Sequence, residues 1–212
     1  MCTMMPCGCR IVPSEKERVE DGEFFYYPRR IGNSVLICGR RQSRFPYQLF
    51  VGPEWPCMLV TYSLIIVPSV FFLRNVATIW GPAVIVLATV SLFVLLIAFS
   101  CTACSDPGIV FKTEQNTLDL ENNNSINDLP VNNLIECSQC RIDRPKTASH
   151  CYQCGVCVEN IDHHCPWTGK CIGEKNLYWF YMFLSALSFH ILLVCAVCIY
   201  SAVAHVSIFP KS

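Results

Sequence analysis

The sequence predicts an α-helical integral membrane protein with three membrane spans and a small cysteine-rich cytosolic domain. Three observations predict it: long uncharged apolar runs, a segment crowded with cysteine and histidine, and an uneven distribution of basic residues. Hydrophobic residues make up 52% of the 212 residues and charged residues only 15%, which is too apolar for an ordinary soluble domain. Basic and acidic residues number 16 each, so net charge provides no argument for nucleic acid as a partner.

Residues 1–56 are expected to form a cytosolic N-terminal tail. The segment is polar and mixed in charge, and it contains an arginine cluster shortly before the first apolar run: Arg29, Arg30, Arg40, Arg41 and Arg44. Basic residues beside a membrane span favour the cytosolic side and attract anionic lipids. We interpret the cluster as a determinant of topology.

Two membrane spans are predicted at about 57–73 and 77–103, because neither range contains a charged residue. A helix that crosses the bilayer needs about 20 apolar residues. Arg74 and Asn75 are expected to form the tight turn between the spans. Pro82, near the start of the second span, is interpreted as a tolerated kink.

The third span is predicted at 177–209, an uncharged stretch rich in Phe, Leu, Val and Tyr. Asn176 is expected to be its N-cap. His190 and His205 lie within this span, and we interpret them as neutral histidines hydrogen-bonded to neighbouring helices rather than as functional groups.

The basic residues also predict the orientation. The tail carries eight Lys and Arg residues and the long loop at 104–176 carries six, whereas the other side has only Arg74 and Lys211. Because basic residues concentrate on the cytosolic side, the tail and the loop are both expected to face the cytosol. We expect a multi-pass protein of an endomembrane, either ER or Golgi, or of the plasma membrane.

The loop begins with an Asp106-Pro107-Gly108 motif and continues as a linker to residue 136. The linker contains seven asparagines and few large apolar residues, which is typical of a flexible polar segment. We expect folded structure to resume at Cys137.

Residues 137–176 are expected to form a domain held by metal. The segment has too few large aliphatic residues to fold by burial alone, and no strand or helix pattern is apparent in it. Cysteines two residues apart suit zinc, because both thiolates can reach one tetrahedral ion, and histidine provides the remaining ligand type. Eight positions have metal-ligand character among Cys137, Cys140, His150, Cys151, Cys154, Cys157, Asp162, His163, His164, Cys165 and Cys171.

The run from Cys137 to Phe180 resembles the DHHC cysteine-rich domain of protein S-acyltransferases (palmitoyltransferases). The matching motifs are Asp162-His163-His164-Cys165 with Pro166 and Trp167, the sequence CIG at 171–173, Asn176 with Phe180, and the earlier Asp106-Pro107-Gly108. Lys170 departs from the family, which commonly has Asn there. The family also usually has a fourth span and a cytosolic TTxE motif, neither of which is found, so we expect a chain truncated after the third span.

The resemblance implies two structural zinc ions with interleaved ligand sets. One set would be Cys137, Cys140, His150 and Cys157, and the other would be Cys151, Cys154, His164 and Cys171. Cys165 and His163 would then remain outside both sets, together with Asp162.

The resemblance further implies protein S-acyltransferase activity. Long-chain acyl-CoA would be the co-substrate, Cys165 would carry the acyl group as a thioester, and cytosolic or membrane proteins with cysteines near the bilayer would accept it. Only a thiolate attacks a thioester well, so the cysteine needs a neighbouring base. His163 would be that base, and Asp162 would hold its imidazole in the required tautomer.

Two other classes of protein compete with this interpretation. A zinc-stabilised membrane adaptor, catalytically weak or inactive because the fourth span is missing, would bind proteins without turnover. It would have no need for a cysteine and a histidine outside the metal sets. A RING-like ubiquitin ligase also uses interleaved zinc ligands, but its loop spacing and ligand order fit this sequence much less well.

Overall fold

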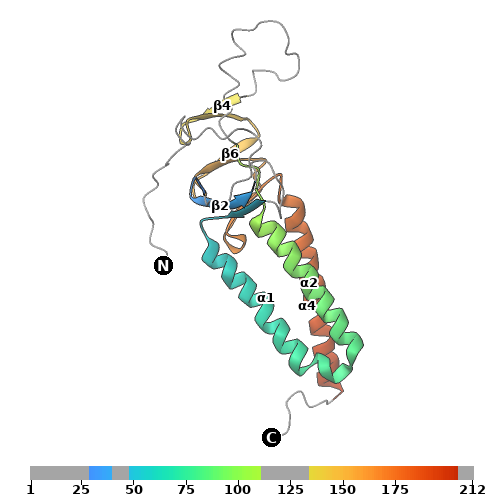
Figure 1. The fold of residues 1–212 in the computed structure, drawn as a ribbon. Coiled ribbons are helices and arrows are strands. Elements are labelled where there is room, and N and C mark those ends of the chain that lie inside the picture. The colour runs from blue at the N-terminus through green and yellow to red at the C-terminus, as the bar shows by residue number, and fades with distance from the viewer. Residues whose placement is uncertain (1–28, 40–47, 111–133, 205–212) are drawn as a thin grey trace.

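The computed structural model describes residues 29–39, 48–110 and 134–204. Helices and strands occupy opposite ends of the molecule (Figure 1). The part predicted to be cytosolic contains short strands, and the three long helices extend from it. The arrangement places the cysteine-rich segment directly against one end of the helices.

Part of the predicted tail forms a three-stranded antiparallel sheet, which the sequence analysis did not anticipate. Its strands are β1 (Arg29–Ile31), β2 (Ser34–Gly39) and β3 (Gln48–Val51), in that order across the sheet. Leu36 and Phe50 are buried in one cluster with Cys151 and Cys154. The sheet is therefore part of the same core as the cysteine-rich segment.

The β1–β2 turn fixes how this sheet lies on the cysteine-rich segment. The backbone amide of Asn33 donates to the carbonyl of Cys154 at 2.8 Å. Gly32 has a φ of +60°, and a Cβ at this position would lie 2.5 Å from the same carbonyl oxygen. Only glycine permits both the backbone conformation and the close approach.

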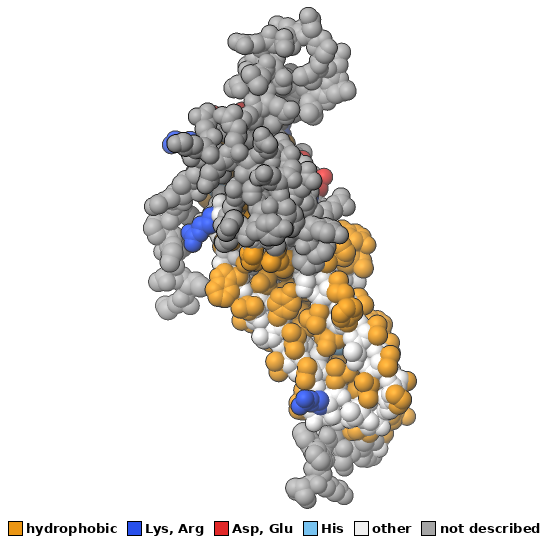
Figure 2. All heavy atoms as spheres, viewed as in Figure 1, with side chains coloured by type: hydrophobic (Ala, Val, Ile, Leu, Met, Phe, Trp, Pro, Cys, Tyr) orange, Lys and Arg blue, Asp and Glu red, His pale blue; other side chains and the backbone are white. Residues whose placement is uncertain are grey.

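Three helices are long and apolar enough to cross a membrane: α1 (Trp55–Asn75), α2 (Pro82–Cys104) and α4 (Leu177–Val203). Hydrophobic side chains are spread along the face of the helices that Figure 2 shows. These helices confirm the predicted α-helical membrane fold. Residues 205–209, at the end of the predicted third span, and His205 lie outside the described residues.

The connection between α1 and α2 differs from the predicted turn. α1 continues through Arg74 and Asn75, and a 3-10 helix, η2 (Ala77–Trp80), follows it. Gly81 then adopts a φ of +90°, and Pro82 is the first residue of α2 rather than a kink within it. Proline suits this position because the first helical N–H has no partner within the helix.

A polar contact ties the three long helices together within their apolar interior. His190 of α4 lies between two serines, with Nε2 2.9 Å from Ser69 Oγ on α1 and Nδ1 2.8 Å from Ser91 Oγ on α2. This is the hydrogen-bonded histidine that the sequence predicted. Elsewhere between α2 and α4, Phe99 and Phe183 pack with ring centroids 5.0 Å apart.

The cysteine-rich segment consists of three two-stranded antiparallel hairpins. They pair β4 (Leu134–Cys137) with β5 (Ile142–Pro145), β6 (Ala148–Cys151) with β7 (Val156–Glu159), and β8 (His163–Cys165) with β9 (Lys170–Ile172). A short 3-10 helix, η4 (Pro166–Thr168), connects β8 to β9. Strands of three or four residues are too short to reveal an alternating pattern, which is why none was recognised in the sequence.

Candidate metal sets and candidate active site

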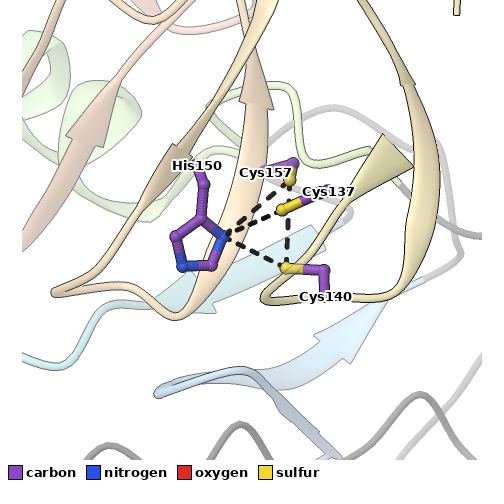
Figure 3. Close-up of side chains that lie close together, drawn as sticks. All are labelled: Cys137, Cys140, His150 and Cys157. Atoms are coloured by element: carbon purple, nitrogen blue, oxygen red, sulfur yellow. Dashed lines mark hydrogen bonds between the residues drawn. The ribbon is translucent and has the colours of Figure 1, made fainter. Parts of the chain in front are cut away.

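The first predicted ligand set comes together around the imidazole of His150 (Figure 3). Its Nδ1 lies 3.2 Å from Cys140 Sγ, 3.8 Å from Cys137 Sγ and 3.9 Å from Cys157 Sγ. The β4–β5 hairpin provides the first two cysteines, and the β6–β7 hairpin provides His150 and Cys157. We call these four residues the His150 set.

The second predicted set comes together around His164, and we call it the His164 set. Its Nδ1 lies 3.4 Å from the sulfurs of Cys151 and Cys154 and 3.5 Å from that of Cys171. The β6–β7 hairpin therefore contributes to both sets, so the two sets are interleaved along the chain. Within each set, all four candidate ligand atoms lie within 4.8 Å of one another.

The donors and charges of the His164 set fit a divalent cation. Three thiols and one imidazole nitrogen are a donor combination that zinc takes in tetrahedral sites. Hydrogen bonds from the thiols of Cys154 and Cys171 lower the pKa of Cys151, whereas the thiols of Cys151 and Cys154 raise the pKa of Cys171. Hydrogen bonding to Cys151 and Cys154 raises the pKa of His164 to about 11. A thiolate at Cys151 thus opposes ionisation of the Cys171 thiol, and a bound cation would offset this repulsion between negative charges.

Strand β8 directs the two histidines of the Asp162-His163-His164-Cys165 tetrad to opposite faces. Successive side chains of a strand point to opposite faces, so His163 and Cys165 share one face and His164 has the other. Across the hairpin, His164 is paired with Cys171 of its own metal set, and Cys165 is paired with Lys170. The alternation therefore turns one histidine toward the metal set and the other toward the face of Cys165.

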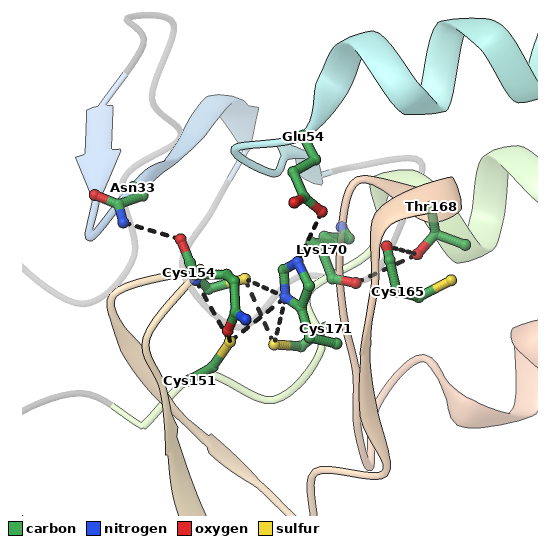
Figure 4. A network of polar contacts seen from close by, with 10 residues as sticks. Asn33, Glu54, Cys151, Cys154, Cys165, Thr168, Lys170 and Cys171 are labelled. Carbon is green, nitrogen blue, oxygen red and sulfur yellow. Dashed lines mark hydrogen bonds and ion pairs between the residues drawn. The ribbon is translucent and has the colours of Figure 1, made fainter. Parts of the chain in front are cut away.

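Cys165 belongs to neither set. Its sulfur points away from those of Cys151, Cys154 and Cys171 (Figure 4). The residue is 8% exposed, and its carbonyl accepts a hydrogen bond from Thr168 Oγ1 at 3.1 Å. The backbone around this thiol is thus held by the η4 turn.

His163 is held in a defined orientation by two contacts. Its Nδ1 lies 2.7 Å from Asp162 Oδ2, and its ring packs edge-on against Phe180 with centroids 5.2 Å apart. With Nδ1–H donating to the carboxylate, Nε2 is the nitrogen that could accept a proton. The three residues predicted to do chemistry therefore lie on one short stretch beside the start of α4.

Lys170, noted in the sequence only as a departure from the family, is fully buried. Its ammonium donates to the carbonyl of Phe50 at 3.1 Å and also to that of Ser105. Burial lowers its pKa to about 8. Negative charge on the nearby Cys104 sulfur, and then on the Asp106 carboxylate, opposes that shift. The side chain joins β9 to β3 and to the end of α2.

The Asp106-Pro107-Gly108 motif connects α2 to the same region. Asp106 Oδ1 accepts from the backbone amides of Gly108 and Ile109 at 2.9 and 3.0 Å, and Oδ2 lies 3.2 Å from Lys175 Nζ. A carboxylate that accepts two amides stabilises this turn. The motif thus holds the end of α2 close to the segment that begins α4.

Asn176 occupies the N-cap position of α4, as expected, but its side chain does not cap the helix. Its Oδ1 accepts from the amide of Gly173, and its Nδ2 donates to the carbonyls of Thr102 and Cys171. The side chain is fully buried. It therefore joins two membrane helices to the β8–β9 hairpin.

Three apolar helices joined to two interleaved sets of three cysteines and one histidine define a membrane protein with a cysteine-rich module whose geometry suits two metal ions. Residues 132–211 match the family model described as DHHC palmitoyltransferase. Together with the curated relatives below, this match shows that the chain belongs to the DHHC palmitoyltransferase family.

The relatives come from animals and plants. Palmitoyltransferase ZDHHC8 of Drosophila melanogaster is 33% identical over 149 residues, which cover 67% of this chain and 15% of that protein. Palmitoyltransferase ZDHHC14 of Mus musculus is 34% identical over 182 residues, covering 74% of this chain and 36% of that protein. Probable protein S-acyltransferase 7 of Arabidopsis thaliana is 29% identical over 213 residues, covering 88% of this chain and 46% of that protein. The chain thus spans less than half the length of these relatives.

The buried ammonium of Lys170 leads to a prediction about stability. Lys170→Met should lower the free energy of unfolding by about 1–3 kcal/mol, because it leaves two buried carbonyls without their donor. The measurement is the thermal midpoint of the detergent-purified protein. Lys175→Met is the matched control, since that lysine is half exposed and its ion pair with Asp106 should contribute less than about 1 kcal/mol. Equal midpoints for the two variants would contradict the prediction.

Proposed function

We propose that this chain is a protein S-acyltransferase that transfers a long-chain acyl group from acyl-CoA to cysteines of other proteins. One observation carries the proposal. Cys165 lies outside both metal sets on the strand face that it shares with His163, and His163 is bound to Asp162. A thiol, a base and an orienting carboxylate are the groups that nucleophilic acyl transfer requires.

In the first step, His163 Nε2 accepts the thiol proton of Cys165. The thiolate then attacks the carbonyl carbon of the acyl-CoA thioester, a new C–S bond forms, and the bond to the CoA sulfur breaks. The CoA thiolate leaves and takes up a proton from the imidazolium. Asp162 stabilises that imidazolium and keeps Nδ1 protonated.

In the second step, a cysteine of a substrate protein takes the place of CoA. Its thiol gives its proton to His163 Nε2, and the thiolate attacks the acyl-enzyme carbonyl. A C–S bond to the substrate cysteine forms, the bond to the Cys165 sulfur breaks, and Cys165 takes the proton back from the imidazolium. The substrates would be cytosolic or membrane proteins with cysteines near the bilayer, because the η4 turn that follows Cys165 contacts the membrane helix α1 through Trp167 and Thr61. The acyl chain would remain in the bilayer, where burial of each CH2 contributes about 0.8 kcal/mol.

Two zinc ions are proposed to have a structural role, one in the His150 set and one in the His164 set. Each set offers four ligands from the protein and leaves no position for substrate, which is typical of structural rather than catalytic zinc. The ions would fix the hairpins that carry the tetrad.

The proposed orientation places the N-terminal tail and the cysteine-rich module in the cytosol. The basic residues support it, since fourteen of the sixteen lie in residues 1–56 and 104–176. A reducing compartment that contains acyl-CoA also suits free thiols in the metal sets and at Cys165.

An acyl-enzyme is the first testable consequence of the proposal. Incubation with radiolabelled palmitoyl-CoA should produce a hydroxylamine-labile adduct that Cys165→Ser abolishes. His163→Ala should slow its formation by about 100-fold because the thiol loses its base, and Asp162→Asn should slow it less.

The control for this experiment is Cys195→Ser, which changes an exposed cysteine on α4 and should leave labelling unchanged. Labelling that survives Cys165→Ser would assign the nucleophile to another cysteine. No adduct from a folded, zinc-replete protein would favour the adaptor function instead.

The zinc proposal predicts two ions per chain by mass spectrometry of the purified protein. Cys137→Ser and Cys151→Ser should each lose zinc and destabilise the module, whereas Cys165→Ser should keep both ions. Acidification should release zinc, because the thiol and imidazole ligands must lose their protons to bind it. A content of one ion or none would overturn the ligand assignment.

The orientation can be tested with sealed microsomes that carry an epitope either at the N-terminus or within residues 111–133. Protease added from the cytosolic side should remove both epitopes, because both segments are proposed to face the cytosol. An epitope placed in a known lumenal protein is the control for membrane integrity. Protection of the 111–133 epitope in intact vesicles would show that the orientation is wrong.

A further inference from the structure

Glu54, at the start of the first membrane helix, contacts a ligand of the second metal set. Its Oε2 lies 2.8 Å from His164 Nε2, across 110 residues of sequence. The other ring nitrogen, Nδ1, faces the three sulfurs of the His164 set. With Nδ1 directed at the metal position, Nε2–H is the donor and the Glu54 carboxylate is the acceptor. Figure 4 shows Glu54 reaching into this network from the residue just before α1.

Two more contacts from the same end of α1 hold the backbone that follows the nucleophile. The amide of Glu54 donates to the carbonyl of Gly169 at 3.2 Å. About two helical turns further along, Thr61 Oγ1 donates to the carbonyl of Trp167 at 2.9 Å. The start of α1, together with Glu54 just before it, therefore contacts His164, which precedes Cys165, and both Trp167 and Gly169, which follow it.

Close packing makes this arrangement specific. Gly169 has a φ of +81°, and a Cβ there would lie 3.3 Å from the carbonyl oxygen of Glu54. A Cβ on Gly52 would lie 1.9 Å from the carbonyl oxygen of Gly169. The segment that leads into α1 and the turn that follows Cys165 are thus in direct backbone contact, and Glu54 sits at their junction.

We propose that Glu54 is a positioning residue, which couples the first membrane span to the His164 metal set and thereby fixes Cys165 at the membrane surface. The proposal rests on the function proposed above. A carboxylate that accepts the second ring N–H of a metal-bound histidine fixes the ring, selects its tautomer and makes the ligating nitrogen more basic. Because His164 directly precedes Cys165 in β8, the position of its ring also sets the position of the thiol.

The neighbouring charged groups are consistent with this role. The Glu54 side chain is about one third exposed, whereas that of His164 is only 12% exposed. The carboxylate therefore lies at the rim while its partner lies inside. Three thiolates around one divalent ion leave a net negative centre, and the buried Lys170 nearby offsets it. The carboxylate accordingly acts on the histidine rather than as a counter-ion for the metal.

The test compares zinc retention in variants of the 212-residue chain, because this readout does not depend on acyl transfer. Glu54→Gln keeps the shape and an acceptor oxygen but removes the charge, and Glu54→Ala removes the hydrogen bond as well. Each purified variant is challenged with a chromogenic zinc chelator at neutral pH. We expect one of the two ions to leave about 10–100 times faster in Glu54→Ala than in the wild type, and Glu54→Gln to lie between them.

The control is Glu174→Gln, which alters a carboxylate of the same module that accepts from Asn160 Nδ2 at 2.8 Å and lies outside both metal sets. This variant should release zinc at the wild-type rate. Gel filtration establishes that each variant is folded. Wild-type release rates in both Glu54 variants would overturn the proposal.

A second readout links the coupling to chemistry. Zinc-saturated Glu54→Ala should form the Cys165 adduct about 10 times more slowly at saturating palmitoyl-CoA, with little change in the KM for palmitoyl-CoA. A change confined to KM would indicate a substrate contact and would overturn the positioning role. If the wild type itself forms no adduct, the proposed function fails, yet the zinc-release comparison still decides whether Glu54 supports the metal set.

Discussion

The rest of the structure depends on the convergence of three sulfurs and one imidazole nitrogen at each of two points in the cysteine-rich module. The hairpins that carry these groups have strands of three or four residues, which alone bury too little surface to be stable. The β6–β7 hairpin contributes to both sets, so neither point can form without constraining the other. In the proposed function, zinc would turn this crowding of thiols from a source of repulsion into the main stabilising interaction.

That module is also fixed to the membrane helices by buried polar side chains rather than by apolar packing alone. Lys170 joins the end of β9 to β3 and α2, and Asn176 joins α2 to the same hairpin. Glu54 brings the start of α1 to the His164 set. Buried polar groups need specific partners, so such contacts define one arrangement where apolar surfaces would permit several. The thiol of Cys165 is consequently held at a constant place relative to the ends of the three helices.

Local features of the sequence predicted the three helices and both metal sets. Contacts between distant parts of the chain could not be predicted from it. Three uncharged runs predicted the three helices, and CxxC spacing together with the family resemblance predicted both groups of four that the fold brings together. The sheet at 29–51 was missed because its short strands lie among arginines that suggested a polar tail. Glu54 carries no signal of its own, since its partner is 110 residues away. Pro82 was read as a kink because the run of apolar residues continues through the 3-10 turn before it.

The order of residues in the tetrad follows from the geometry of a strand. Catalytic groups normally come from distant parts of a chain, so neighbouring residues alone are weak grounds for assigning chemistry. In β8, however, alternation places His163 and Cys165 on one face while His164 turns to its metal set. An adaptor that only needed the metal would require His164 but neither of the other two. The hydrogen bond between His163 and Asp162, and the position of Cys165 outside both metal sets, therefore favour a module built to present a reactive thiol.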